Sequence, residues 1–410
     1  MKRRVVVTGM AGISPIGNDW QSVRTRLGEY RNAVTRMQDW ADYDGLNTQL
    51  GAPAAPFELS DKYNRKTTRS MGRIAIMATR ATELALQDAG LLDDPLVQGG
   101  QMGISYGSSA GTPSAIGDFG RMMEDRTTKG INATTYIKMM AHTAPVNIGV
   151  FFGVTGRVVT TSSACTSGSQ GIGYAYEAIR NGQQLAMIAG GAEELCATEA
   201  AVFDTLFATS VKNDAPRTTP RPFDQQRDGL VIGEGAGTLI LESLEHATAR
   251  GARIHAELVG FGTNSDGTHV TQPKAETMKI AMQLALADAG LQPSDIGYVN
   301  AHGTGTQHGD IAESQATAAV FGNTMPISSL KSYMGHTLGA CGALEAWISI
   351  EMMREGWFAP TINLEQVDPQ CAQLDYIVGQ GRRIDCEYVM SNNFAFGGIN
   401  TSLIFKQYRG

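Results

Sequence analysis

The chain has 410 residues, of which 42% are hydrophobic, and its formal net charge is −7. This length suggests two or three domains with a real core, while the acidic balance gives no support for bulk binding of nucleic acid. The sequence contains no run of about 18 apolar residues, so it predicts no membrane span.

Cysteine usage indicates the compartment. The chain has five cysteines, an odd number, and no two of them are spaced as CxxC. A disulfide framework and a zinc site therefore both fit poorly, and a reducing cytoplasm is the expected location.

The first element along the chain begins at Arg4. Basic residues followed by Val5–Val7 resemble a signal peptide, but Thr8 and Gly9 end the apolar run early. A first β-strand over 4–8, followed by a turn, fits this pattern better.

A local basic segment follows at residues 61–73, DKYNRKTTRSMGR. The default interpretation of such a charge run is a solvated helix face. Its basic side chains are Lys62, Arg65, Lys66, Arg69 and Arg73.

The chain carries an internal repeat at an offset of 200 residues. Residues 81–91 read ATELALQDAGL and residues 281–291 read AMQLALADAGL, with eight of eleven positions identical. Each segment has helical spacing and stops at a glycine. A strand that ends in a glycine-rich turn is predicted after each copy, over 102–108 and 296–304, so duplication explains the match best.

Further strands are predicted over 257–262, 185–190 and 389–391, and the alternation of strands and helices indicates an α/β fold. We expect an N-terminal half over 1–250 that carries a nucleophile and a C-terminal half over 251–410, with the site where they meet. The break is predicted near 245–256, after a helix at Leu244–Arg250.

The strongest local chemistry lies around Cys165. A strand over Val158–Thr161 precedes it, small residues surround it, and a helix is predicted to follow through Ile179. A thiol at a helix N-terminus is expected to have a lowered pKa, and nearby N–H groups can form part of an oxyanion hole. Cys196, Cys341, Cys371 and Cys386 are interpreted as buried structural residues.

Two of the seven histidines lie in glycine-rich turns of the second half, His302 in NAHGTGT and His336 in KSYMGHTLG. Two neutral imidazoles that donate hydrogen bonds would stabilise the enolate formed when a malonyl thioester loses CO₂. Lys331 is expected to lower the pKa of a nearby histidine, and Glu345 is its expected ion-pair partner. The other five histidines are interpreted as surface or structural residues.

Five segments of this chain resemble motifs of the elongating β-ketoacyl-ACP synthases. They are TSSACTSG, NAHGTGT, LKSYMGHTLGACG, RPFDQQRDGLVIGEGAG (221–237) and NNFAFGGIN (392–400). They stand in family order over nearly the whole chain, which makes the resemblance very specific. It implies a thiolase-like fold, with duplicated α/β halves in a five-layered αβαβα core, and usually a homodimer.

The resemblance also implies residue roles. Cys165 would be the acylated nucleophile, His302 and His336 would bind the malonyl carbonyl, and Lys331 and Glu345 would organise the site. Further from the nucleophile, Thr304 and Thr306 would contact the pantetheine arm. Phe394 and Phe396 would belong to the acyl pocket, where Phe396 acts as a gate and its N–H completes the oxyanion hole.

The implied partner is an acyl carrier protein, which presents both acyl and malonyl groups on phosphopantetheine, and no metal or redox cofactor is implied. Acyl carrier proteins are acidic, and the resemblance places their docking around Lys66 and Arg69. Lys62 and Arg65 of the same basic segment are expected to take part. Charge complementarity would mainly speed the encounter.

Within the family, the resemblance is to synthases I and II, and GGAEELCATEAAVFD (190–204) looks more like type I. The gating loop departs from the family pattern F-G-F-G-G-T-N, because Ala395 replaces a glycine and Ile399 replaces the threonine. Alanine restricts φ and ψ where glycine would let a loop swing. The acyl pocket could therefore accept an unusual acyl chain. Polyene or polyketide assembly is an open alternative to housekeeping fatty-acid synthesis.

Other members of the superfamily fit less well. A chain-length factor, the inactive partner in a ketosynthase heterodimer, lacks the nucleophile that is present here. Thiolase needs a second catalytic cysteine in a Cys-Gly setting near the C-terminus, which neither Cys371 nor Cys386 provides. Starter-type and chalcone synthases use Cys-His-Asn, whereas His336 stands where the asparagine would be expected.

Overall fold

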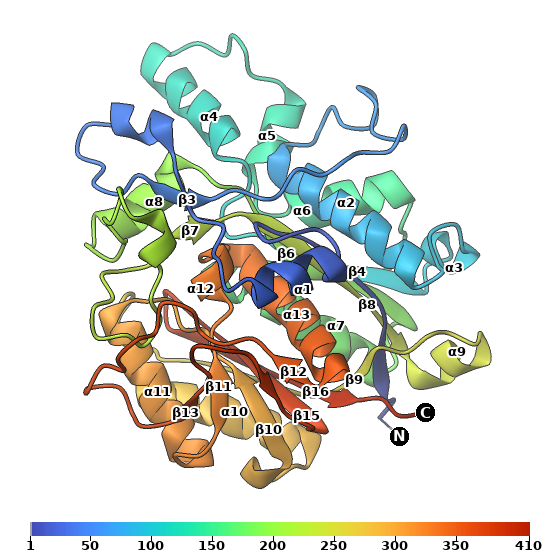
Figure 1. The fold of residues 1–410 in the computed structure, drawn as a ribbon. Coiled ribbons are helices and arrows are strands. Elements are labelled where there is room, and N and C mark those ends of the chain that lie inside the picture. The colour runs from blue at the N-terminus through green and yellow to red at the C-terminus, as the bar shows by residue number, and fades with distance from the viewer. Residues whose placement is uncertain (1) are drawn as a thin grey trace.

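The computed structural model describes residues 2–410 (Figure 1), and within them one sheet contains eleven strands. The strand order is β13-β11-β10-β15-β16-β9-β1-β8-β6-β4-β5. Their bounds are β1 (Val5–Ile13), β4 (Met102–Gly107), β5 (Val158–Thr161), β6 (Ala186–Glu193), β8 (Gly235–Ser243), β9 (Ala256–Ser265), β10 (Ile296–Asn300), β11 (Pro326–Ser328), β13 (Asp375–Tyr376), β15 (Tyr388–Ala395) and β16 (Ile399–Gln407).

Helices and short elements complete the fold. The α-helices are α1 (Trp20–Gly28), α2 (Arg73–Asp88), α3 (Pro95–Gln98), α4 (Pro113–Asp125), α5 (Ala133–Met139), α6 (Thr143–Phe152), α7 (Ser167–Arg180), α8 (Ala197–Asp204), α9 (Leu244–Ala249), α10 (Ala275–Ala289), α11 (Gln307–Phe321), α12 (Lys331–Met334) and α13 (Cys341–Glu355). The short strands are β2 (Thr35–Arg36), β3 (Leu50–Ala52), β7 (Ile232–Gly233), β12 (Trp357–Phe358) and β14 (Arg382–Arg383). The 3₁₀ turns are η1 (Gln38–Asp42), η2 (Ala164–Thr166), η3 (Pro216–Thr218), η4 (Pro293–Asp295) and η5 (Leu338–Ala340).

The sheet confirms the duplication predicted from the repeat. Going outward from its centre, β1-β8-β6-β4-β5 and β9-β16-β15-β10-β11 have the same pairing types in the same order: two antiparallel ladders, then two parallel ones. The two sets join where β1 pairs antiparallel with β9, Val6 opposite Glu257. The repeated sequence segments fall at the ends of α2 and α10, which occupy equivalent places.

Five layers follow from this topology. Helix α2 packs on β1, β6 and β8 from outside, α10 packs on β9 and β16, and α7 and α13 lie between the two halves of the sheet (Figure 1). The central core joins both halves through residues such as Ile172, Leu239, Trp347 and Leu403. Because helices cover both faces, every residue of β1 is buried. No helix in the described range is long and apolar enough to cross a membrane.

Two glycines bring the central helices together at their N-terminal ends. A Cβ on Gly168 would lie 2.8 Å from the backbone oxygen of Gly339, and one on Gly342 would lie 2.6 Å from the backbone nitrogen of Ser169. Only glycine permits so close an approach of backbones. The chain segments that precede α7 and α13, which carry Cys165 and His336, therefore meet.

Most predicted elements are present, with two corrections. Thr8 and Gly9 form a bulge inside β1 rather than a turn, because the strand continues against β8 to Ile13. The basic segment before α2 forms turns rather than a helix. In it the side chain of Asn64 accepts the backbone N–H groups of Lys66 and Thr67, and such local bonds compete with helix formation.

Candidate active site

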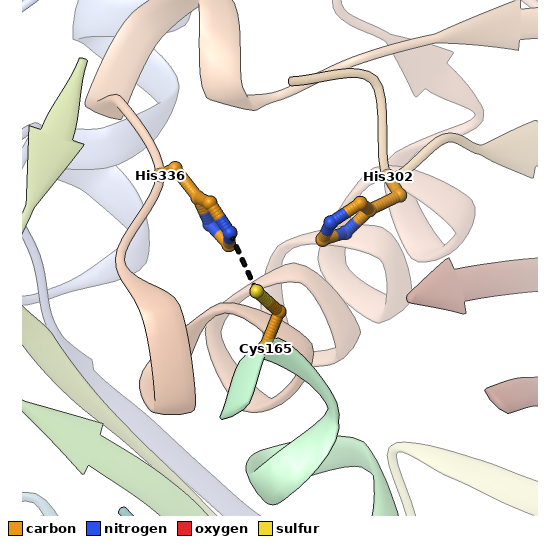
Figure 2. Close-up of side chains that lie close together, drawn as sticks. All are labelled: Cys165, His302 and His336. Carbon is orange, nitrogen blue, oxygen red and sulfur yellow. Dashed lines mark hydrogen bonds between the residues drawn. The ribbon is translucent and has the colours of Figure 1, made fainter. Parts of the chain in front are cut away.

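Cys165 lies in the turn η2, directly before α7, as the sequence predicts (Figure 2). Ala164 before it has a φ of 50°, a left-handed conformation that is uncommon outside glycine. This sharp turn between β5 and α7 points the sulfur toward the segments from the second half. The backbone N–H groups of Phe396 and Cys165 are in position to hydrogen-bond the ionised sulfur.

The predicted lowering of the thiol pKa is wrong. Burial raises the pKa of Cys165 to about 12, although the charge of Lys331 and the two backbone N–H groups lower it. The residue is only 4% exposed, so the loss of water around the thiolate outweighs the favourable charges and dipoles. Cys165 is therefore a thiol, not a thiolate, near neutral pH.

The two histidines converge on this sulfur from different loops (Figure 2). His336 follows α12, and its Nε2 lies 3.0 Å from Cys165 Sγ. His302 follows β10, and its ring stands nearly perpendicular to that of His336, at 5.1 Å between centroids and 89°. Both histidines are buried, as is the sulfur on which they converge.

Both imidazoles are neutral near neutral pH. Burial and then the charge of Lys331 lower the pKa of His302 well below its ordinary value, and His336 lowers it further. The same two causes, in the same order, lower the pKa of His336. This agrees with the predicted effect of Lys331 on a neighbouring histidine.

Lys331 and Glu345 form the predicted ion pair, with Nζ 2.5 Å from Oε1 and both side chains fully buried. Burial lowers the pKa of Lys331, but the charge of Glu345 and other nearby groups raise it more, so the ammonium persists. Its Nζ also lies 3.2 Å from His302 Nδ1. Because an ammonium can only donate, Nδ1 accepts and the ring proton resides on Nε2.

Two buried carboxylates shape the loop around His302. Glu313 accepts the backbone N–H groups of His302 and Gly303, both at 2.7 Å. Asp310 accepts those of Thr304 and Gly305, at 3.0 and 3.2 Å. The glycine-rich loop is thus held by the first turns of α11.

A cavity of about 440 Å³ opens onto the three converging residues. Thr304 and Thr306 line it, with their hydroxyl oxygens 2.9 Å apart. Phe394 and Phe396 line it as well, and the Phe396 ring packs on Phe203 at 5.0 Å between centroids. Polar and aromatic walls therefore meet at Cys165.

Three possible metal-ligand atoms, one each from Cys165, His302 and His336, lie within 4.8 Å of one another. The ammonium of Lys331 beside His302 opposes binding of a cation there.

The basic segment lies apart from this cavity. Lys62, Arg65, Lys66 and Arg69 are all exposed, and Lys62 lies 3.9 Å from Asp93. Arg73 instead forms an ion pair with the buried Glu234. All five basic side chains are thus exposed, and Arg73 is the one that pairs with a buried acid.

Several site residues were missed from the sequence. Asn393 and Cys341 contact the catalytic candidates directly, and Glu313 and Asp310 hold the His302 loop. Asp310 could have been identified, because it lies in the first turn of α11 directly after the glycine-rich loop, where an acidic side chain can accept backbone N–H groups. No local signal distinguishes Asn393 from Asn392.

Comparison with known families identifies the class of protein. The family described as "Beta-ketoacyl synthase, N-terminal domain" matches residues 2–247, and "Beta-ketoacyl synthase, C-terminal domain" matches residues 255–365. The chain therefore belongs to the β-ketoacyl synthase family, an acyltransferase family with the thiolase-like fold.

Individual relatives support the same family assignment. The chain is 37% identical to the 3-oxoacyl-[acyl-carrier-protein] synthase 2 of Synechocystis, covering 100% of this chain and 99% of the relative. It is 36% identical to the synthase 1 of Escherichia coli K12, covering 99% and 100%.

Solved structures agree as well, and each of those below covers 100% of both chains. A β-ketoacyl synthase from Burkholderia phymatum has a TM-score of 0.98 at 60% identity. The ishigamide ketosynthase/chain length factor has a TM-score of 0.90 at 31% identity. A type II PKS ketosynthase solved with its acyl-carrier protein and a hexaketide has a TM-score of 0.87 at 30% identity.

Proposed function

We propose that this protein is a 3-oxoacyl-ACP synthase that loads an acyl group on Cys165 and extends it with malonyl-ACP by decarboxylative Claisen condensation. The observation that carries the proposal is the convergence of a buried thiol and two neutral imidazoles at the end of one cavity. The names of full-length relatives support the same reaction.

In the first step the sulfur of Cys165 attacks the acyl thioester carbonyl, and the bond to the pantetheine sulfur breaks. The thiol proton passes through His336 Nε2 to the departing pantetheine sulfur, because Nε2 is 3.0 Å from Sγ. The backbone N–H groups of Cys165 and Phe396 stabilise the oxyanion between the two bonds.

In the second step malonyl-ACP enters past Thr304 and Thr306 and loses CO₂. The electron pair of the broken carbon–carbon bond forms an enolate, whose oxygen accepts hydrogen bonds from Nε2–H of His302 and of His336. His302 holds that proton because Lys331 occupies its Nδ1. His336 Nδ1 has no hydrogen-bond partner within residues 2–410, so its ring can carry the proton on either nitrogen.

In the third step the enolate carbon attacks the Cys165 thioester. A carbon–carbon bond forms as the bond from the acyl carbon to the Cys165 sulfur breaks. The released thiolate takes up a proton from solvent, and 3-oxoacyl-ACP departs. The acyl chain lies beside Phe394 and Phe396, and Phe396 acts as the gate. The chemistry uses phosphopantetheine delivered by the carrier and needs no metal or redox cofactor.

The carrier docks on Lys62, Arg65, Lys66 and Arg69, whose exposed cations complement an acidic protein. A structural relative solved with its acyl-carrier protein supports a carrier as partner. The enzyme acts in the cytoplasm, where thiols stay reduced. The chain divides functionally into a nucleophile half, 1–250, and a His/His/Lys half, 251–410.

We further propose a homodimer formed through β5. This strand is the last in the sheet and pairs only with β4 within residues 2–410, which leaves its other edge open, and Val158 on it is 48% exposed. A second copy can extend the sheet across a twofold axis. One structural relative is described as a ketosynthase/chain length factor, so a heterodimer is the alternative that the experiment must exclude.

The reaction is tested by mass spectrometry of carrier-bound products. Purified protein is incubated with malonyl-ACP and a panel of saturated and polyunsaturated acyl-ACPs. A 3-oxoacyl-ACP two carbons longer supports the proposal, and the preferred primer distinguishes fatty-acid from polyene or polyketide elongation. No product and no acylated Cys165 with any primer would refute it for the isolated chain.

Two variants separate the steps. Cys165→Ala is expected to abolish condensation, so retained condensation would refute the role of Cys165. Cys165→Gln is expected to block acyl transfer while malonyl decarboxylation continues. If decarboxylation vanished as well, the assignment of that step to the histidines would be wrong.

A further inference from the structure

The side chain of Asn393 occupies the centre of the buried polar network behind the active site. It projects from β15 toward α13, and its Nδ2 lies 2.7 Å from Glu345 Oε2. Because a carboxylate only accepts hydrogen bonds, the amide must turn its NH₂ group to Glu345. Asn393 therefore satisfies the oxygen of Glu345 that Lys331 leaves free.

The same NH₂ group approaches two further parts of the site. It lies 3.4 Å from His302 Nδ1 and 3.6 Å from Cys341 Sγ. The thiol of Cys341 in turn donates to the backbone oxygen of Cys165 at 3.2 Å. Asn393 thus lies where the ion pair, the histidine loop and the nucleophile turn come together.

Geometry explains why this bond matters to the reaction. Lys331 fixes the tautomer of His302 by donating to Nδ1, and the ammonium is held in place by Glu345 Oε1. If Glu345 rotated, its second oxygen would compete for the ammonium and draw it away from His302. A hydrogen bond from a neutral amide holds the carboxylate without adding a competing charge.

We propose that Asn393 is a positioning residue for the decarboxylation step, which acts through Glu345 and Lys331 to keep the ring proton of His302 on Nε2. This inference rests on the proposed function. It assigns Asn393 to the decarboxylation step, in which the histidines hold the enolate. Acyl transfer to Cys165 should therefore depend on Asn393 much less than decarboxylation does.

Asn393→Asp is the sharpest test, because it keeps the shape and exchanges the amide for a carboxyl. The titratable groups in contact with Asn393 are Glu345 and Cys341 on α13 and His302 after β10. Lys331 bonds Glu345 and His302, and η2, which packs on β15, carries Cys165. While the introduced carboxyl is protonated, its O–H replaces the amide donor. As pH rises the carboxyl ionises beside Glu345, and the two carboxylates repel each other and displace Glu345.

The experiment measures malonyl-ACP decarboxylation from pH 5.5 to 9 in the Cys165→Gln background, with and without Asn393→Asp. We expect the rate of the double variant to approach that of Cys165→Gln at low pH and to fall roughly tenfold to hundredfold as pH rises, the range expected for loss of a hydrogen bond to a charged group. Asn392→Asp is the matched control, because Asn392 is equally buried on the same strand and bonds Ser402 instead. Its profile should follow that of Cys165→Gln.

A second measurement uses Asn393→Ala with Cys165 intact. Acylation of Cys165 by acyl-ACP, followed by protein mass, should stay within about threefold of wild type while condensation falls by the roughly tenfold or more expected for the lost bond. Identical pH profiles for the 393 and 392 variants, or equal losses in acylation and condensation, would overturn the inference. Absence of decarboxylation in Cys165→Gln itself would instead refute the proposed function.

Discussion

Removing one partner of the Lys331–Glu345 pair should destabilise the protein strongly, whereas removing both should not. Neither side chain is exposed to water, and their charged atoms are 2.5 Å apart. Lys331→Met leaves a buried carboxylate without its cation, and Glu345→Gln leaves a buried ammonium without its anion. Each single change should therefore cost about 3–5 kcal/mol of unfolding free energy.

The double variant Lys331→Met/Glu345→Gln leaves no unpaired charge. Its cost should not exceed that of either single variant, which gives a coupling energy of about 3 kcal/mol or more. All three variants should nevertheless lose decarboxylation, because each lacks either the ammonium that fixes the proton of His302 or the carboxylate that holds the ammonium in place. Stability thus recovers in the double variant while activity does not.

Urea unfolding at one fixed protein concentration measures the four free energies. The exposed pair Asp118–Arg121 on α4 is the control, with side chains 41% and 66% exposed. Asp118→Asn and Arg121→Met should each change stability by less than about 1 kcal/mol and show almost no coupling. Single costs below about 1 kcal/mol at 331 and 345, or costs that simply add, would refute the reasoning.

Three further changes test other parts of the structure. Glu199 on α8 is buried, and burial, then Glu193 and Glu194, raises its pKa from 4.5 to about 9. Since Glu199 ionises only in the unfolded state between these values, its own contribution to the free energy of unfolding falls as pH rises from 4.5. Glu199→Gln should therefore raise the free energy of unfolding in urea by roughly 3 kcal/mol at pH 7 but by little at pH 5. An equal gain at both pH values would contradict this. Ala395→Gly should make the backbone around Phe396 more flexible. The rate at which long acyl-ACPs acylate Cys165 should then rise up to about fivefold, the equivalent of about 1 kcal/mol. Unchanged rates across chain lengths would show that Ala395 does not limit the movement of Phe396. In the proposed homodimer, Val158→Lys would place a charge on the edge of β5 that joins the two copies. Analytical ultracentrifugation should therefore give the mass of a dimer for wild type and of a monomer for the variant. A dimer in both would place the interface elsewhere, and a monomer in both would refute the homodimer.

The sequence alone predicted the fold class, the duplication and the residues that converge on the site. The repeated helices at 81–91 and 281–291 carry the duplication because both copies keep the same spacing and glycine stop, which are local properties. Cys165, His302 and His336 were identifiable because each lies in a glycine-rich or small-residue turn at the end of a strand or the start of a helix, where local pattern is strong.

Only the tertiary structure decided how these residues behave. The pKa of Cys165 is raised rather than lowered, because burial depends on segments far away in the chain that close over the sulfur. Asn393 could not be distinguished from Asn392 in the sequence, because successive side chains of a strand point to opposite faces of the sheet. Only the packed structure shows that Asn393 contacts Glu345 on α13 and that Asn392 bonds Ser402. Local sequence sets which chemistry is available, while burial and long-range contacts set charge, tautomer and position.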